Sequence, residues 1–177
     1  MDELLLHNKK FKLYKDYNLI ENEVNKMSKA ITNDLSGKSP VFICLLTGAF
    51  MFASDLIKNI DFDCNIAFVK LSSYKGTQSK GKVTKILGLD TVIENRHVVL
   101  VEDIVDSGTT LNFFLNALKE RKPASIRIAA MFHKPEASLH SIHIDYLGMN
   151  IENKFVVGYG LDFDGLGRNY KDLYIEI

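Results

Sequence analysis

The order of hydrophobic and polar positions predicts helices and strands that alternate through the middle of the chain. Between residues 18 and 35, apolar residues recur at spacings of three and four, and Asn18 followed by Glu21 matches a capping box at a helix start. The uninterrupted apolar run 41–46 instead predicts a strand that is covered on both faces. Further strands are predicted at 65–71, 97–101 and 125–132. Residues 49–60 and 110–122 have helical spacing, and residues 83–89 form a further strand-like segment.

Strand–helix alternation of this kind predicts an α/β fold with a central, mostly parallel sheet flanked by helices. Shorter strand-like pieces follow at 146–151, 155–159 and 173–177. We therefore expect a single domain over residues 1–177, with its core at about 35–140. The chain-terminal segments, about 1–17 and 145–177, are expected to form a small hood over that core.

The charge balance restricts the partners that the protein can bind. The chain has 22 basic and 22 acidic residues, a formal net charge of zero, and 46% of its residues are hydrophobic. A general nucleic-acid binder would show a basic excess, so we expect no nucleic-acid partner. A small phosphorylated ligand held by a local site remains compatible with neutrality.

No segment of the sequence has the pattern of a membrane span or a secretion signal. The most apolar stretch, 41–53, is interrupted by Thr47 and Gly48 and is shorter than the ~20 residues that a span needs. The first residues carry acids where a secretion signal carries bases. Cys44 and Cys64 form no CxxC pair, and Cys44 lies within a predicted strand. We expect a soluble cytoplasmic protein without a membrane partner.

Residues 98–111 carry the pattern of a phosphate site. Four apolar residues lead into Glu102 and Asp103, and Asp106 follows before a loop of small and hydroxyl residues enters a predicted helix. Backbone N–H groups, hydroxyls and the helix dipole can hold a phosphate there without Lys or Arg. The acids suit sugar hydroxyls or Mg²⁺. The alternative is a strand-end turn followed by a helix cap, in which three acids within five residues would be costly to pack.

This segment resembles the phosphoribosyl diphosphate signature of the phosphoribosyltransferases, and other landmarks point to the hypoxanthine-guanine branch. The resemblance extends over about residues 41–170 and implies the type I phosphoribosyltransferase fold. It implies that Glu102 and Asp103 bind the ribose hydroxyls and that Asp106 accepts a proton from the purine ring. The residues that would surround the ribose and its 5′-phosphate are Glu102, Asp103, Ile104, Val105, Asp106, Ser107, Gly108, Thr109 and Thr110.

Two further segments resemble the loops of this family that enclose the leaving group. Residues 45–49 resemble the pyrophosphate loop, in which a cis peptide bond would lie between Leu46 and Thr47 and Gly48 would follow. Many relatives have Lys where this chain has Thr47, so a charged contact from this position is absent. On the residues alone, Thr47 and Gly48 also fit a simple turn after a strand, which is the less favoured alternative. By resemblance Arg168 would also reach the pyrophosphate, and residues 71–76 would begin a mobile loop that contains Ser73 and Tyr74.

The last third of the chain resembles the purine pocket of the same family. Residues 132–135 resemble the segment whose Lys, here Lys134, donates to the oxygen at purine position six, and residues 154–159 resemble the segment whose ring, here Phe155, stacks on the base. On its own, Phe155 also fits a core position. The residues implied for the purine side are Lys134, Phe155, Val156 and Asp162. Those implied for the metal are Glu102, Asp103 and Asp162, and the implied cofactor is Mg²⁺.

The resemblance therefore implies transfer of a phosphoribosyl group from phosphoribosyl diphosphate to hypoxanthine or guanine, giving IMP or GMP and pyrophosphate. It also implies a homodimer or homotetramer. Two alternatives remain open at this point: an enzyme directed to xanthine or a pyrimidine, and an RNA-binding regulator built on the same fold. The neutral charge balance disfavours the RNA-binding regulator.

Overall fold

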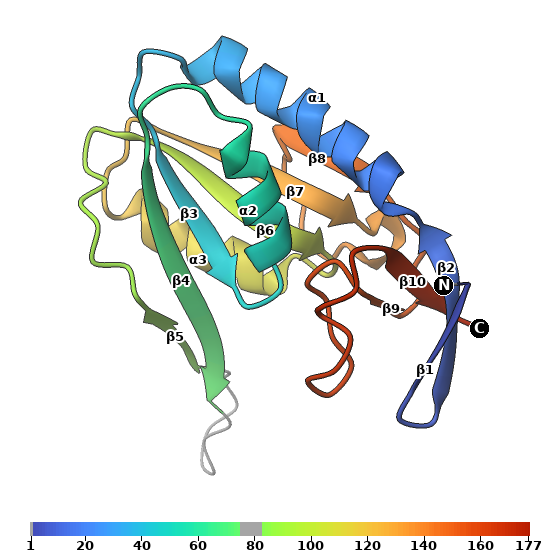
Figure 1. Ribbon diagram of the computed structural model, residues 1–177. Coiled ribbons are helices and arrows are strands. Elements are labelled where there is room, and N and C mark those ends of the chain that lie inside the picture. The colour runs from blue at the N-terminus through green and yellow to red at the C-terminus, as the bar shows by residue number, and fades with distance from the viewer. Residues whose placement is uncertain (1, 75–82) are drawn as a thin grey trace.

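The computed structural model describes residues 2–74 and 83–177, and for residues 72–74 and 83–87 it describes the backbone alone. Its main sheet has six strands in the order β5-β4-β3-β6-β7-β8 (Figure 1). Strands β4, β3, β6, β7 and β8 are parallel, which confirms the predicted α/β sheet. Strand β5 pairs antiparallel to β4 at the edge of the sheet. The bounds are β3 (Val41–Leu46), β4 (Asn65–Tyr74), β5 (Val83–Leu87), β6 (His97–Val105), β7 (Ser125–His133) and β8 (Tyr146–Asn150).

Helices cover both faces of the main sheet (Figure 1). Helices α1 (Tyr17–Leu35) and α2 (Phe50–Lys58) pack on one face, in a cluster that includes Phe42 and Cys44 of β3. Helix α3 (Thr109–Lys119) packs on the other face, and a short 3₁₀ turn (Pro135–Ala137) follows β7. Cys44 is a buried free thiol, as its place in a strand predicts.

Helix α1 begins earlier than the capping-box pattern predicts. The N-cap is Asp16, whose carboxylate accepts a hydrogen bond from the backbone N–H of Leu19 at 3.0 Å, so the Asn18–Glu21 assignment is wrong. Asp16 satisfies one of the free N–H groups at the helix start in the same way that Asn18 was expected to do. None of the helices in the described part of the chain is long and apolar enough to cross a membrane.

The two ends of the chain meet in a second sheet, which we call the hood. Its four strands are β1 (Glu3–Leu6), β2 (Lys9–Lys15), β10 (Leu173–Glu176) and β9 (Val156–Val157), in that spatial order. The C-terminal part of the hood was expected to begin at about residue 145, but its first strand is β9, at Val156. The preceding strand, β8, pairs with β7 and so belongs to the main sheet. Tyr146 of β8 packs into the cluster beneath α1, which keeps this strand with the core.

Candidate active site

A cavity of about 370 Å³ lies where the loops that follow β3, β6 and β7 meet the hood. In open α/β sheets, ligands bind at the carboxyl ends of the strands, and this cavity has that position. Most of the predicted site residues line it: Leu46, Gly48, Glu102, Asp103, Ile104, Asp106, Thr110, Lys134, Phe155, Val156, Asp162 and Arg168. The apolar residues Leu45, Leu71 and Leu161 also line it; Leu45 and Leu71 begin two of the segments that resemble the family, but none of the three was assigned a contact of its own.

Two adjacent acids, Glu102 and Asp103, lie within strand β6 rather than after it, because β6 continues to Val105. Asp103 accepts a hydrogen bond from the backbone N–H of Ile104 at 2.8 Å. Glu102 Oε2 is buried and has no hydrogen-bond partner among the described residues. Removal from water, reinforced by the charge of Asp103, raises the pKa of Glu102 well above its usual value. Burial likewise raises the pKa of Asp103, to about 6.

The raised pKa of Glu102 predicts that Glu102→Gln stabilises the folded protein at alkaline pH. A raised folded-state pKa favours folding below the ordinary carboxyl pKa, and that contribution is lost as the pH rises through the raised value. Removing the charge should therefore raise Tm at about pH 8 by a few degrees, since ~1 kcal/mol shifts Tm by ~2–4 °C at this size. The gain should shrink toward about pH 4, where Glu102 is already neutral.

Scanning calorimetry across this pH range measures the effect, with Glu94→Gln as the matched control because Glu94 is an exposed glutamate. The control should leave Tm nearly unchanged at every pH. An equal gain from Glu102→Gln at both ends of the range would show that buried charge is not the cause.

The loop between β6 and α3 forms a second, smaller cavity of about 130 Å³ that adjoins the first. Gly108 has φ of +73°, and a side chain there would approach Ile142 to 2.7 Å, so the turn into α3 requires glycine. The first backbone N–H groups of α3 have no partner within the helix, and the positive end of its dipole lies beside them. This arrangement suits an anion such as a phosphate.

Not every hydroxyl of that loop faces the small cavity. Ser107 and Thr110 line it, and Ser107 Oγ accepts from the N–H of Thr109 at 3.3 Å. Thr109 lines neither cavity, and its Oγ1 lies 3.3 Å from Nε2 of His140. A contact from Thr109 to the phosphate stays a prediction, and it would come from the backbone N–H rather than from this hydroxyl.

The peptide bond between Leu46 and Thr47 is cis, as the resemblance implies. Gly48 follows it, and a Cβ atom there would overlap the carboxylate of Asp103, so a larger residue would displace that acid. Thr47 is not among the residues that line the cavity. The loop therefore offers backbone rather than a charged side chain at this position.

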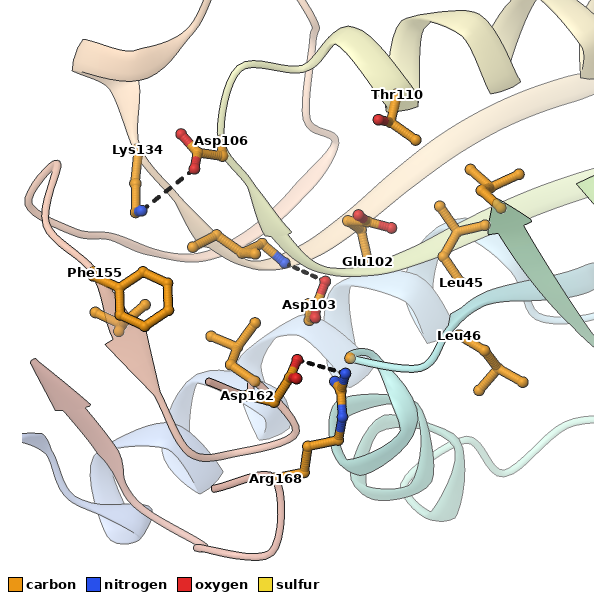
Figure 2. Close-up of a pocket in the computed structure, with 15 residues that line it drawn as sticks. Leu45, Leu46, Glu102, Asp103, Asp106, Thr110, Lys134, Phe155, Asp162 and Arg168 are labelled. Atoms are coloured by element: carbon orange, nitrogen blue, oxygen red, sulfur yellow. Dashed lines mark hydrogen bonds and ion pairs between the residues drawn. The ribbon is translucent and has the colours of Figure 1, made fainter. Parts of the chain in front are cut away.

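Two cations line the cavity in the described part of the chain, and each is paired with an acid (Figure 2). Arg168 Nη2 lies 2.5 Å from Asp162 Oδ1, and its Nη1 donates to the carbonyl of Gly160 at 2.8 Å. Lys134 Nζ lies 3.4 Å from Asp106 Oδ2. Lys134 is 7% exposed, so its charge is held inside the protein by this carboxylate.

The acids of the cavity do not form a closed metal cage. Within residues 2–74 and 83–177, no three His, Cys, Asp or Glu side chains gather closely enough to hold a metal ion. Asp162, which was expected to bind metal, pairs with Arg168 and also accepts from the N–H of Gly165 at 2.8 Å. The unpartnered oxygen of Glu102 and the carboxylate of Asp103 are hard oxygen donors that suit Mg²⁺, which usually retains waters and phosphate oxygens.

Phe155 forms an aromatic wall of the cavity, beside Lys134 and Asp106 in Figure 2. It is 39% exposed and so is not the core residue that its sequence context also allows. Behind it, Phe163 packs at 5.5 Å between ring centroids and Phe11 at 6.1 Å. These two supports come from opposite ends of the chain, and the sequence offered no signal that would join them to Phe155.

The predicted mobile loop falls mainly outside the described residues. Ser73 and Tyr74 end β4 as backbone, and residues 75–82 are not described. Leu71, just before them, lines the cavity, so β4 leads toward it. The role of Ser73 and Tyr74 stays a prediction.

The acid pair Glu102 and Asp103 lies near the carboxyl end of β6, and the hydroxyl-rich start of α3 follows it in the chain. This arrangement suits a phosphorylated sugar. Residues 12–164 match the family model described as the phosphoribosyl transferase domain. A hypoxanthine-guanine phosphoribosyltransferase of Streptococcus pyogenes is 40% identical over 162 residues, which are 91% of this chain and 88% of that protein. A hypoxanthine-guanine-xanthine phosphoribosyltransferase of Tritrichomonas foetus is 40% identical over 151 residues, 85% of this chain and 82% of that one.

Solved structures agree with these relatives. A crystal structure of a hypoxanthine-guanine phosphoribosyltransferase from Bacillus anthracis has a TM-score of 0.87 at 31% identity, covering 94% of this chain and 98% of that one. A hypoxanthine phosphoribosyltransferase from Staphylococcus aureus also has a TM-score of 0.87, at 37% identity, covering 94% and 91%. The chain belongs to the hypoxanthine-guanine phosphoribosyltransferase family.

Proposed function

We infer that this protein transfers the 5-phosphoribosyl group from phosphoribosyl diphosphate to a 6-oxopurine, hypoxanthine or guanine, and releases pyrophosphate. The observation that carries this inference is one cavity in which Lys134, Asp106 and Phe155 lie near the acid pair Glu102 and Asp103. A base site and a sugar-phosphate site that share a cavity bring the two reactants into contact. The family membership supports the same reaction.

The donor side of the reaction is assigned to β6, α3 and the loop after β3. The N–H groups at the start of α3, with Ser107 and Thr110, hold the 5′-phosphate, while Glu102 and Asp103 accept hydrogen bonds from the ribose hydroxyls. The unpartnered Oε2 of Glu102 supports this assignment, because a buried acceptor without a donor is costly until a ligand supplies one. The backbone at Gly48 and the guanidinium of Arg168 face the pyrophosphate.

The acid pair of the cavity fits Mg²⁺, because carboxylate oxygens are ligands that this ion prefers. When bound, Mg²⁺ would neutralise charge that develops on the departing pyrophosphate. Glu102, Asp103 and Asp162 are the residues that would hold it. This explains how a protein of zero net charge can bind a highly anionic donor.

The acceptor side is assigned to Lys134, Phe155, Val156 and Asp106. Phe155 stacks on the purine, a contact worth ~1–3 kcal/mol for bases on aromatic side chains. Lys134 donates to the oxygen at position six and Val156 contacts the base edge through its backbone. Asp106 accepts the proton that the attacking ring nitrogen loses, and its carboxylate is accessible because its side chain is 55% exposed.

The remaining assignments follow the resemblance to the family. Ser73 and Tyr74 belong to a loop that closes over the reacting atoms and excludes water, which would otherwise compete with the base. The protein is proposed to act in the cytoplasm as a homodimer or homotetramer, without a nucleic-acid or membrane partner.

A panel of bases tests the proposed function. With Mg²⁺ and phosphoribosyl diphosphate present, the ultraviolet absorbance of added hypoxanthine or guanine should change with time as the nucleotide forms, and that of added adenine or uracil should stay constant. Xanthine is measured in parallel because a xanthine-accepting relative exists. Turnover restricted to a pyrimidine, or no turnover with any purine, would contradict the assignment.

A further inference from the structure

The hood turn that carries Asp162 and Arg168 begins with three consecutive residues of positive φ. Gly158 has φ of +96°, Tyr159 of +47° and Gly160 of +96°. Glycine adopts this region freely, but a tyrosine there is uncommon because its Cβ crowds the backbone. The conformation of Tyr159 must therefore be held by its surroundings.

Contacts on every part of Tyr159 supply that restraint. Its side chain is fully buried, its ring lies edge-on to Phe132 at 6.3 Å between centroids, and its N–H donates to the carbonyl of Tyr170 at 2.7 Å. Its hydroxyl donates to Asp55 Oδ2 at 2.9 Å. Burial and the nearby carboxylate raise the pKa of Tyr159, so the hydroxyl keeps its proton and remains a donor.

Asp55 lies on α2, the helix that follows the loop of the cis peptide. Its Oδ2 also lies 3.5 Å from the hydroxyl of Tyr17, and its Oδ1 accepts from Lys58 at 2.8 Å. Neither Asp55 nor Tyr159 lines the cavity. Their hydrogen bond therefore joins the hood to the helix that carries the pyrophosphate loop, from outside the site.

The contacts continue from Tyr159 to the cavity through one residue, Gly160. The N–H of Gly160 donates to the carbonyl of Arg168 at 3.1 Å, and Arg168 Nη1 donates back to the carbonyl of Gly160 at 2.8 Å. Gly160 also lies so close to the carbonyl of Gly48 that a Cβ atom there would overlap it. A shift of Gly160 would thus move Arg168 relative to Gly48.

We propose that the hydroxyl of Tyr159 and the carboxylate of Asp55 form a positioning pair that sets the separation of Gly48 and Arg168 at the pyrophosphate end of the cavity. The proposal rests on the proposed function, which assigns these two residues to the donor. The pair contacts no substrate and acts through Gly160. Its effect should fall mainly on the donor, because Lys134 and Phe155, which hold the purine, lie outside the turn that contains Gly160 and Arg168.

Tyr159→Phe tests the pair, since it removes the hydroxyl and keeps the buried ring. The KM for phosphoribosyl diphosphate should rise about 10-fold, the scale for a lost hydrogen bond to a charged group. The KM for hypoxanthine should stay within about twofold, since the purine contacts are unchanged. Asp55→Ala should match Tyr159→Phe and add little to it in the double variant. Asp55→Asn, which keeps an acceptor oxygen, should restore most of the donor affinity.

Tyr146→Phe is the matched control. Tyr146 is also a buried tyrosine whose hydroxyl donates to a helix carboxylate, Asp34 Oδ2 at 2.8 Å, but it does not line the cavity. It should lower Tm and leave the KM for the donor unchanged. An unchanged donor KM in Tyr159→Phe, or an equal rise in both KM values, would overturn the proposal.

Calorimetric binding of magnesium pyrophosphate separates this proposal from the proposed function, because it requires no turnover. The affinity should fall about 10-fold in Tyr159→Phe and remain unchanged in Tyr146→Phe. If the unaltered protein fails to convert purines but this difference in affinity is found, the function is wrong and the positioning pair stands. Equal affinity in the unaltered protein and Tyr159→Phe would overturn the pair alone.

Discussion

Replacing Asp106 by Asn is expected to lower kcat with hypoxanthine by about 10²–10⁴-fold, the range that general acid–base catalysis supplies. Asn has the same size as Asp and can remain near Lys134, but its amide cannot accept the proton that the purine nitrogen loses. The KM values for both substrates should change little, because Asp106 is assigned a role in the reaction rather than in holding either ligand. Steady-state kinetics with each substrate varied in turn measures this difference.

Asp90→Asn is the matched control, since Asp90 is an exposed aspartate that does not line the cavity. Its kinetic constants should equal those of the unaltered protein. If Asp106→Asn turns over hypoxanthine at the unaltered rate, the proton acceptor lies elsewhere and the proposed mechanism is wrong.

Replacing Lys134 by Ala is expected to remove the preference for 6-oxopurines. A hydrogen bond from a charged donor contributes about 1.5–3 kcal/mol, so kcat/KM for hypoxanthine should fall about 10–100-fold. Adenine should gain relative to hypoxanthine, because its amino group no longer faces an ammonium group that it cannot pair with. Competition between the two bases for a limited amount of donor gives the ratio directly.

The loss of Lys134 also leaves Asp106 without the ammonium group 3.4 Å away, so folding must be checked in parallel. Lys29→Ala, at an exposed position on α1, is the control for loss of a lysine charge. An unchanged ratio of hypoxanthine to adenine in the folded Lys134→Ala variant would contradict the role of Lys134 in base selection.

The central strands β3, β6 and β7 could be predicted from the sequence because each contains a run of buried apolar residues. Val41–Leu46 is one such strand, and the prediction matches its bounds. The position of Glu102 and Asp103 near the carboxyl end of a core strand could be predicted for the same reason, although β6 extends through them to Val105. Hydrogen bonds to β7 hold this extension, and they depend on a partner strand more than 20 residues away in the chain.

The hood was harder to predict because the hairpin of β1 and β2 joins the rest of this sheet only by pairing with the other end of the chain. Strand β2 pairs with β10, so residues near 12 and 175 meet. In β1, Leu4 and Leu6 are buried and Leu5 is exposed, a two-residue alternation too short to identify a strand by itself. The burial of Leu4 follows from packing with residues such as Phe11 and Tyr174. The contact with Tyr174 cannot be predicted from local pattern, because the two residues lie at opposite ends of the chain.

The chemical state of the site also depends on contacts that residue types do not reveal. The order Glu102-Asp103 predicts a binding role, but the raised pKa values of both acids depend on how fully β6 withdraws them from water. Gly48 looks like a turn residue, whereas its constraint is the Asp103 carboxylate packed against it. The contact between Gly48 and Asp103 joins two segments far apart in the chain, so only the folded structure reveals it.

The central claim is that this protein joins a phosphoribosyl group to a 6-oxopurine, and product stoichiometry tests it most directly. The purified protein is incubated with hypoxanthine, phosphoribosyl diphosphate and Mg²⁺, and the products are separated by ion-exchange chromatography. We predict that IMP and pyrophosphate appear in equal amounts as hypoxanthine disappears, and that no product forms when Mg²⁺ is chelated. Pyrophosphate release without IMP, or no loss of hypoxanthine, would contradict the account.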